Sequence, residues 1–365
     1  MPSIYFYISG HGYGHASREI EVINQLVPRL PGWRVVARTS ASRWLFDRTA
    51  APQLTLIEGA CDTGVVQIDS VRLDESATIR AAVDFYAGFE ARIRPEAAML
   101  ERDDARLVVV DAPPLACAAA AAAGVPSVVL SNFTWDWIYE AYGAASAPGL
   151  LSTMRDAYGH AEAGWRLPLH GGFAGFERLV DVPFVARHAT VPAAEVRRRL
   201  GLPAQAPLVL TSFGGYGLDA FDPLRLDCGG RWHVVVTGRE PPSPCPDWLH
   251  VLDDNAVYDA GMRYEDLVAA ADVVVTKPGY GIISECIANG TAMLYTSRGR
   301  FPEYDVMVAE MPRLLRCAFI DRTALLEGRW RTALETLART PPPAERPRTD
   351  GAEVIAAMIA ARVGG

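Results

Sequence analysis

Short runs rich in valine and isoleucine alternate with longer helical patterns along most of the chain, and the pattern starts again near residue 207. In the first half we expect strands at 3–9, 33–38, 53–58, 107–110 and 126–130, and helices at 15–29, 75–101, 114–123 and 135–145. In the second half we expect strands at 207–211, 232–236, 249–252, 272–275 and 291–295, and helices at 192–200, 264–271, 280–289 and 303–314. Such alternation is typical of parallel sheets flanked by helices. The sequence therefore predicts an α/β protein with two doubly wound units.

The length of the chain supports two domains. Its 365 residues are 50 % hydrophobic, which is enough for two cores of about 150 residues each. We place the domains at 1–180 and 181–345, because Gly171 and Gly172 loosen the chain near this point. A last helix at 350–363 is expected to pack back on the first domain. Ligands bind beyond the carboxyl ends of strands in such sheets, so two facing sheets would form a binding cleft.

Charge and cysteine content argue against several classes of partner. The net charge of -8 disfavours nucleic acid or an anionic membrane as the main partner, because both attract basic surfaces. The six cysteines are scattered singly, which favours reduced, buried thiols and argues against a metal site. The sequence shows no secretory leader or transmembrane segment, so we expect a cytoplasmic protein. Peripheral membrane contact, and the choice between monomer and dimer, stay open.

Three glycines and two histidines occupy the turn between the first strand and the first helix, Gly10-His11-Gly12-Tyr13-Gly14-His15. Glycines such as Gly12 and Gly14 let the backbone approach a ligand, and a helix start offers free N–H groups. The helix dipole disfavours imidazolium there, so we prefer His15, where we expect the helix to begin, over His11 as a general base. Capping of the helix is the alternative role.

An aspartate at a strand end is the expected partner of this base. Asp111 follows the apolar strand at 107–110, and the carboxyl end of a strand lies on the ligand side of the sheet. We expect Asp111 to orient His15, as the third group of a catalytic triad does. Capping of the next helix is the alternative.

The same glycine-rich turn does not fit a dinucleotide. The fingerprint G-x-G-x-x-G would need glycine where His15 stands, and the strand at 33–38 ends without an acidic residue for a ribose. We therefore expect no nicotinamide, flavin or other prosthetic group.

Two loops in the second half have features of an anion site. The turn Phe213-Gly214-Gly215-Tyr216 follows a strand, and its amides could converge on a phosphate, although an ordinary tight turn is the alternative. Lys277 is the only lysine of the chain, and a compact ammonium beside a diphosphate would explain its retention, with chance as the alternative. Glu285 could accept both hydroxyls of a ribose, or simply stabilise the start of its helix.

Two further segments at strand ends could contact a substrate. Asn132, Phe133, Trp135 and Asp136 belong to an aromatic cluster that could form the wall of an acceptor site or part of the core. The segment Phe301-Pro302-Glu303-Tyr304-Asp305 offers the carboxylates of Glu303 and Asp305 to sugar hydroxyls, or to solvent as helix caps.

Together these motifs resemble a GT-B glycosyltransferase over nearly the whole chain. Gly12-Tyr13-Gly14-His15 is similar to the base-bearing turn of the peptidoglycan UDP-N-acetylglucosamine transferase, and Val109-Val110-Asp111 resembles the strand-end aspartate of plant-type UDP-glycosyltransferases. The segments from Ser9 to Arg18 and from Ser131 to Asp136 are similar in sequence to the glycosyltransferase-like N-terminal portion of L-arabinokinases. No galactokinase-type half follows in this sequence, so sugar phosphorylation is not expected.

The resemblance implies two Rossmann-like domains facing across a cleft, with the base in the first and a nucleotide-sugar donor in the second. It implies donor contacts from Arg187, Phe213, Gly214, Gly215, Tyr216, Met262, Arg263, Lys277, Gly279, Tyr280, Gly281, Ser284 and Glu285. The His-Gln or Asp-Gln pair that usually holds the donor sugar is replaced by Glu303 and Asp305. The identity of the sugar therefore stays open.

We predict an inverting, metal-independent glycosyltransferase that moves a sugar from a nucleotide diphosphate sugar to the hydroxyl of a small-molecule acceptor. UDP is the favoured nucleotide, and His15 is the general base. A nucleotide-sugar 2-epimerase of the same fold would use carboxylates as bases and is one alternative. A non-catalytic protein that binds sugar nucleotides is the other.

Overall fold

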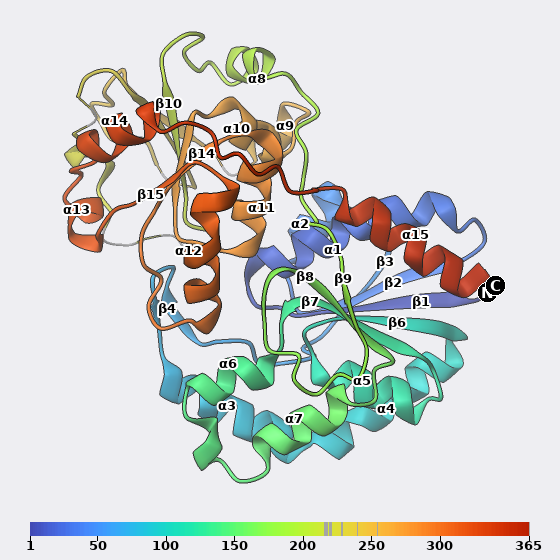
Figure 1. Ribbon diagram of the computed structural model, residues 1–365. Coiled ribbons are helices and arrows are strands. Elements are labelled where there is room, and N and C mark those ends of the chain that lie inside the picture. Colours follow the sequence, from blue (N-terminus) through green and yellow to red (C-terminus); the bar gives the residue numbers. More distant parts are fainter. Residues whose placement is uncertain (215–217, 219–220, 228, 239, 254, 365) are drawn as a thin grey trace.

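The computed structural model describes residues 1–214, 218, 221–227, 229–238, 240–253 and 255–364. These residues form two α/β domains, each built around one parallel sheet, and the domains contact each other along one side (Figure 1). The predicted fold class is therefore confirmed.

The N-terminal domain contains a seven-stranded parallel sheet in the order β3-β2-β1-β6-β7-β8-β9. Its strands are β1 (Ser3–Ile8), β2 (Arg34–Thr39), β3 (Thr55–Glu58), β6 (Ala105–Asp111), β7 (Ser127–Phe133), β8 (Ala163–Gly171) and β9 (Leu179–Asp181). Its helices are α1 (Gly12–Leu26), α2 (Arg43–Thr49), α3 (Glu75–Ala87), α4 (Phe89–Arg102), α5 (Pro114–Ala122), α6 (Trp135–Ala141) and α7 (Leu150–Tyr158). A small antiparallel hairpin, β4 (Gln67–Asp69) and β5 (Arg72–Leu73), extends toward the other domain (Figure 1).

The C-terminal domain contains a six-stranded parallel sheet in the order β12-β11-β10-β13-β14-β15. Its strands are β10 (Leu208–Ser212), β11 (His233–Thr237), β12 (Leu249–Leu252), β13 (Val273–Thr276), β14 (Ala292–Tyr295) and β15 (Cys317–Phe319). Its helices are α8 (Ala193–Arg199), α9 (Ala256–Asp259), α10 (Tyr264–Ala270), α11 (Tyr280–Asn289), α12 (Pro302–Leu314), α13 (Arg322–Leu326) and α14 (Arg331–Arg339). The order of its strands repeats that of the first six strands of the N-terminal sheet.

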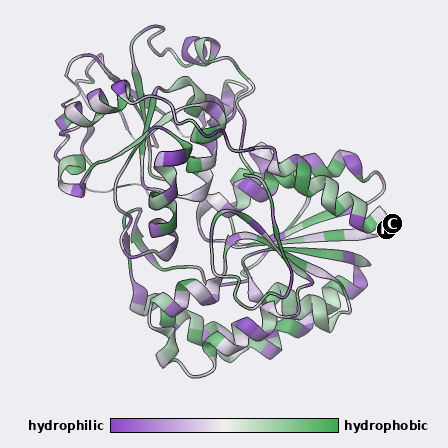
Figure 2. Ribbon diagram, in the orientation of Figure 1, coloured by the Kyte–Doolittle hydropathy of each residue, from purple (hydrophilic) through white to green (hydrophobic). Residues whose placement is uncertain are grey.

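The final helix, α15 (Gly351–Gly364), returns to the N-terminal domain and packs along α1 (Figure 1). Ile355 and Ile359 of α15 are fully buried in the same apolar cluster as Ile20 and Ile23 of α1. The hydropathy colouring follows this arrangement, with apolar strands inside and polar residues on the outer helices (Figure 2). Within the described residues, no helix is long and apolar enough to cross a membrane.

Two differences from the sequence prediction concern the elements of the N-terminal domain. The stretch around Gly171, expected to be a loose joint, contains β8 and β9, which complete the N-terminal sheet. Strand β8 was missed because Arg166, Pro168 and His170 interrupt the continuous apolar run that is expected of a strand in a parallel sheet. The expected helix at 75–101 is divided at Gly88 into α3 and α4.

The packing of α15 on α1 predicts a stability effect. Replacing Ile355 with alanine should lower the free energy of unfolding by about 2–5 kcal/mol, because it leaves a cavity in the core. The same substitution at Ile68, whose side chain is 58 % exposed, should change it by no more than about 0.5 kcal/mol. Urea unfolding followed by circular dichroism measures both, and equal losses would show that α15 does not share this core.

Candidate functional site

The places where strand order reverses in the two sheets face each other. In the N-terminal sheet this point lies between β1 and β6, and in the C-terminal sheet between β10 and β13, which is where doubly wound sheets bind ligands. The helices that follow β1 and β13, α1 and α11, meet at their N-termini. A Cβ atom built on Gly281 of α11 would lie 3.7 Å from the Cα atom of Gly14 in α1. The two predicted ligand-binding turns are therefore in contact.

A cleft of about 180 Å³ lies at this contact and is lined by both domains. Its walls from the N-terminal domain are His11, Gly12, Tyr13, Gly14, His15, Arg18, Gln67, Asn132 and Phe133. Its walls from the C-terminal domain are Ser212, Phe213, Gly214, Thr276, Lys277, Pro278, Gly279, Tyr280, Gly281, Ile282, Arg298, Phe301 and Glu303.

Helix α1 begins earlier than the sequence indicated. It starts at Gly12 rather than near Ala16, so His11 is the N-cap residue and His15 lies in the first turn. Gly12 has a φ of +71°, a conformation that favours glycine. A side chain at Gly10 would collide with Ser40, whose Oγ would be 2.0 Å from the new Cβ atom. The glycines thus allow the chain to turn tightly from β1 into α1.

His15 and Asp111 form the pair that the sequence predicted. Nδ1 of His15 lies 3.0 Å from Oδ1 of Asp111, and both side chains are almost completely buried. Asp111 is the last residue of β6 and pairs in register with Ile8 at the end of β1. The opposite ring nitrogen, Nε2, has no hydrogen-bond partner within the described part of the chain, and His15 lines the cleft.

The sequence analysis missed Arg18, which lies one helical turn after His15 and holds the same carboxylate. Its Nε donates to Oδ2 of Asp111 at 2.8 Å, and its Nη2 donates to Oδ1. Burial alone would raise the pKa of Asp111, but the positive charge of Arg18 holds it well below its usual range. The available signal was that Arg18 follows His15 by three positions, because residues with this spacing lie on the same face of a helix.

His11 is held in a different way. The backbone N–H of Val65 lies 3.3 Å from its Nδ1, and the side-chain amide of Gln67 lies 3.3 Å from its Nε2. Its ring stacks on Phe301 of the C-terminal domain with centroids 6.2 Å apart. Burial and the neighbouring His15 hold the pKa of His11 well below its ordinary value. With Nδ1 engaged as an acceptor, His11 is placed to support the cleft wall rather than to take a proton there.

Two cations enter the cleft from the ends of β13 and β14. The side-chain ammonium of Lys277 lines the cleft and has no hydrogen bond or ion pair to a described residue, whereas its backbone carbonyl accepts a hydrogen bond from Oγ1 of Thr276 at 3.0 Å. Burial, reinforced by the positive charge of Arg298, lowers the pKa of Lys277 to about 7. Arg298, which the sequence analysis missed, is 8 % exposed and lies over the ring of Phe301 at 4.0 Å. Its position just beyond a buried strand was the signal that could have identified it.

Glu303 connects Arg298 to the other domain. Its Oε2 accepts a hydrogen bond from Nη1 of Arg298 at 3.2 Å, and its Oε1 accepts one from Nδ2 of Asn132 at 2.6 Å. Asn132 in turn accepts from Nη1 of Arg18 at 2.6 Å. The carboxylate predicted to bind a sugar hydroxyl is therefore part of a polar chain that crosses the cleft. Asp305, by contrast, is exposed on α12 and does not line the cleft.

The predicted aromatic wall is divided between cleft and core. Phe133 lines the cleft and its ring contacts His15 edge to face, with centroids 5.4 Å apart. Trp135 is fully buried and donates from Nε1 to Asp62 at 2.7 Å. Asp136 pairs with Arg155 at 3.1 Å. The neighbouring side chains thus belong to the core of the N-terminal domain.

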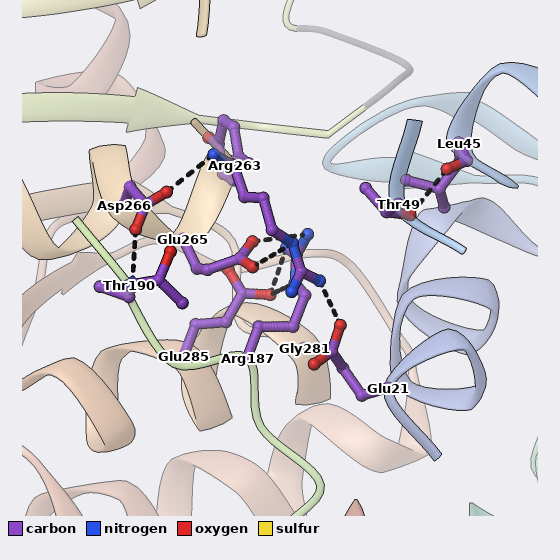
Figure 3. A network of polar contacts seen from close by, with 12 residues as sticks. Glu21, Leu45, Thr49, Arg187, Thr190, Arg263, Glu265, Asp266, Gly281 and Glu285 are labelled. Carbon is purple, nitrogen blue, oxygen red and sulfur yellow. Dashed lines mark hydrogen bonds and ion pairs between the residues drawn. The ribbon is translucent and has the colours of Figure 1, made fainter. Parts of the chain in front are cut away.

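The predicted nucleotide contacts Arg187 and Glu285 pair with each other beside the start of α11 (Figure 3). Nε of Arg187 donates to Oε1 of Glu285 at 2.8 Å, while Oε2 of Glu285 is buried without a partner. Arg187 also lies 3.3 Å from the fully buried Glu265. Arg263, another predicted contact, pairs with Glu265 at 2.7 Å.

This ionic cluster crosses the domain boundary. Arg263 donates to Glu21, which belongs to α1 in the other domain (Figure 3). The cluster therefore contains three carboxylates, from Glu21, Glu265 and Glu285, and two guanidinium groups. Burial raises the pKa of Glu285, and Arg187 offsets part of that effect.

The remaining predicted residues are placed as follows. Met262 is buried beside Arg263, and Ser284 is buried in α11, where its hydroxyl donates to the carbonyl of Gly281 at 2.8 Å. Gly215 and Tyr216 lie outside the described residues. No group of three or more His, Cys, Asp or Glu side chains that could hold a metal ion is found among the residues that the structure describes.

Comparison with known proteins identifies the fold of the chain. No family model matches the chain. The chain is 30 % identical over 342 residues to L-arabinokinase of Arabidopsis thaliana. The match covers 90 % of this chain and 31 % of that protein, so the chain spans about a third of its relative's length.

Three solved glycosyltransferases share the fold over nearly the full length of both chains. CalG4, the calicheamicin glycosyltransferase, has a TM-score of 0.65 with 17 % identity, covering 99 % of this chain and 98 % of that one. UGT2 of Phytolacca americana, complexed with UDP-2-fluoro-glucose and pterostilbene, has a TM-score of 0.62 with 11 % identity and covers 100 % of both. VinC, in complex with dTDP, has a TM-score of 0.56 with 15 % identity, covering 100 % and 95 %. The chain therefore has the GT-B fold of these glycosyltransferases.

Proposed function

We propose that this protein is an inverting glycosyltransferase that transfers a sugar from a UDP-sugar to an acceptor hydroxyl without a metal ion. One observation carries the proposal: His15, paired with Asp111, shares a cleft with Lys277 and the N-terminus of α11. A base and an anion site on opposite sides of one cleft are what direct displacement of a nucleoside diphosphate requires. The GT-B fold of three glycosyltransferases supports the same reading.

In this reaction Nε2 of His15 takes the proton of the acceptor hydroxyl. The hydroxyl oxygen forms a bond to the anomeric carbon from the face opposite the diphosphate, while the bond from that carbon to the diphosphate oxygen breaks. The configuration at the anomeric carbon is therefore inverted. Asp111, 3.0 Å from Nδ1, stabilises the imidazolium that forms.

The leaving diphosphate receives both electrons of the broken bond. Amide groups at the start of α11, from Gly279 to Gly281, and the cations Lys277 and Arg298 are placed to stabilise its charge. Since these groups supply positive charge and hydrogen bonds, the proposed step uses no metal ion.

The ribose would lie beside Glu285. The buried Oε2 of this carboxylate lacks a partner, and a ribose hydroxyl would supply the missing hydrogen bond. The base would lie near the backbone of Met262 and Arg263. The complex of UGT2 with a UDP-sugar supports UDP, and the complex of VinC with dTDP makes thymidine the competitor to be tested.

A donor must widen the cleft as it enters. The cleft volume of about 180 Å³ is below the roughly 300 Å³ of the smallest usual ligand pockets. Contacts between the domains, such as Trp44 with Asn255 at 3.0 Å and Arg48 with Asp259 at 2.9 Å, would have to separate. Relative motion of two domains is common where polar contacts join them.

The decisive experiment is a thermal-shift screen with UDP, dTDP, GDP and their sugars, followed by incubation with a panel of hydroxylated acceptors. We expect stabilisation by UDP-sugars and a product whose anomeric configuration, read by proton NMR, is opposite to that of the donor. Retention of configuration would overturn the mechanism. An epimer formed from the donor alone would indicate an epimerase, and binding without turnover across the panel would indicate a non-catalytic protein.

Replacing His15 with alanine should reduce transfer by about 100- to 10,000-fold, because the step loses its general base. The affinity for UDP, measured by calorimetry, should stay within a few fold, because the nucleotide lies in the other domain. His160, which is exposed, gives the matched control, and its alanine variant should keep full activity. Unchanged turnover of the His15 variant would remove His15 as the base.

The lowered pKa of Lys277 predicts that the protein takes up a proton when it binds the donor. Its pKa of about 7 leaves the free amine mostly neutral at pH 8, and a bound diphosphate raises the pKa by favouring the charged form. The affinity for UDP-glucose should therefore fall as pH rises from 6.5 to 8.5. Calorimetry in buffers of different ionisation enthalpy should show proton uptake at pH 8, and none for Lys277→Arg, which stays charged. Equal uptake by both proteins would contradict this role.

Replacing Glu285 with alanine should weaken UDP binding by about tenfold, as expected for the loss of one or two hydrogen bonds. The 2′,3′-dideoxy analogue of UDP provides the control, because it lacks the hydroxyls that Glu285 would bind. Its affinity should be the same for the wild type and the variant. A similar loss for both nucleotides would mean that Glu285 only supports the fold around Arg187.

A further inference from the structure

His15 Nδ1 faces a donor and an acceptor at nearly equal distances. Oδ1 of Asp111 lies 3.0 Å from it, and Nη2 of Arg18 lies 3.1 Å from it. An ionised carboxylate can only accept a hydrogen bond, and a guanidinium can only donate one. The two neighbours therefore favour opposite tautomers of the ring.

The tautomer decides whether His15 can act as a base toward the cleft. With the proton on Nδ1, the ring donates to Asp111 and leaves Nε2 free to accept. With Nδ1 accepting from Arg18, the proton sits on Nε2 and that atom cannot take another. Arg18 would therefore prevent His15 from acting as a base if it donated an Nη2 hydrogen to Nδ1. It would support that role if this hydrogen were donated elsewhere.

Ser131 provides another acceptor for Arg18. Nη2 of Arg18 has two hydrogens, and one is given to Oδ1 of Asp111. The other can go to Oγ of Ser131, which lies at 3.1 Å, or to His15. Ser131 in turn donates its own hydrogen to Oδ1 of Asp111 at 3.1 Å. When Ser131 accepts from Arg18, Nδ1 of His15 is free to carry the proton.

Electrostatics favours this second arrangement. An unprotonated Nδ1 would place its lone pair 3.0 Å from an ionised carboxylate oxygen, and two acceptors at that distance repel each other. Both hydrogen bonds from Arg18 also hold the carboxylate in one orientation, so that Oδ1 faces the ring.

We propose that Arg18 is a positioning residue for His15. It can act in this way because Ser131 accepts the hydrogen that Arg18 would otherwise donate to Nδ1 of His15. Together they fix the imidazole proton on Nδ1 and leave Nε2 unprotonated toward the cleft. Arg18 also lies over the ring of Tyr280 at 5.1 Å, so contact with the C-terminal domain helps to hold it. The inference rests on the proposed function only for the statement that Nε2 receives the acceptor proton.

The proton position can be measured without substrate. In protein labelled with ¹⁵N-histidine, long-range proton–nitrogen spectra distinguish protonated from unprotonated ring nitrogens, and His15→Gln assigns the signals among seven histidines. We expect the Nδ1–H form in the wild type. Ser131→Ala should move the population several-fold toward the Nε2–H form, because it releases the hydrogen of Arg18 to Nδ1. Ser127→Ala, the same change on the same strand, should leave the signals unchanged.

Arg18→Lys provides a second variant, because lysine keeps the charge but cannot hold both carboxylate oxygens. It should give a mixture of His15 tautomers, whereas Arg34→Lys, which alters an ion pair with Asp103 at 2.9 Å, should not. Tautomers identical to the wild type in both Ser131→Ala and Arg18→Lys would overturn the proposal. A wild-type protein already in the Nε2–H form would do the same.

Kinetics separate this proposal from the proposed function. Once an acceptor is known, kcat of Ser131→Ala should fall in proportion to the lost Nδ1–H population, with KM for the UDP-sugar unchanged. UDP affinity should be equal in the wild type and the variant. Failure of all UDP-sugars to bind would contradict the proposed function and leave the tautomer result intact, whereas normal transfer with an unshifted tautomer would contradict the positioning role alone.

Discussion

Everything in the site depends on the close approach of two helix N-termini. A Cβ atom built on Gly281 of α11 would lie 3.7 Å from the Cα atom of Gly14 in α1, which is an ordinary van der Waals distance, so the starts of the two helices are close neighbours. Because each helix follows a central strand of its sheet, the contact also brings together the points where the strand order reverses. The predicted base of one domain thereby faces the predicted anion site of the other.

Charge balance determines what each part of the cleft can hold. Around the base, the negative charge of Asp111 is matched by Arg18. On the donor side, Glu303 matches Arg298, and Lys277 is left without a counterion among the described residues. A buried charge without a partner is costly, and Lys277 avoids much of this cost through its lowered pKa. The C-terminal side of the cleft therefore carries a cation without an ion-pair partner among the described residues, which suits the anion proposed to bind there, while the charges around His15 are already matched.

The sequence predicted groups that the backbone brings together more reliably than contacts that side chains make. His15 and Asp111 could be paired because both follow strands that are neighbours in a doubly wound sheet. Arg187 and Glu285 were predicted as separate nucleotide contacts, but the structure pairs them, because lengths and rotamers of long side chains cannot be read from spacing. Arg18 was missed for a related reason: its role depends on Asp111 and Ser131, which are distant in sequence. The strand β8 was missed because a proline and two polar or charged residues interrupt the continuous apolar run that is expected of a strand in a parallel sheet.

The ionic cluster beside α11 joins the proposed nucleotide site to the N-terminal domain. The cluster contains three carboxylates and only two guanidinium groups. Oε2 of Glu285 has no partner among the residues that the structure describes, so it could accept a hydrogen bond from a donor such as a ribose hydroxyl. Arg263 belongs to the same cluster and also pairs with Glu21 in the other domain. The proposed ribose contact at Glu285 would involve the carboxylate that also pairs with Arg187. In the proposed function, a nucleotide would therefore bind beside the same cluster that joins the two domains through Arg263 and Glu21.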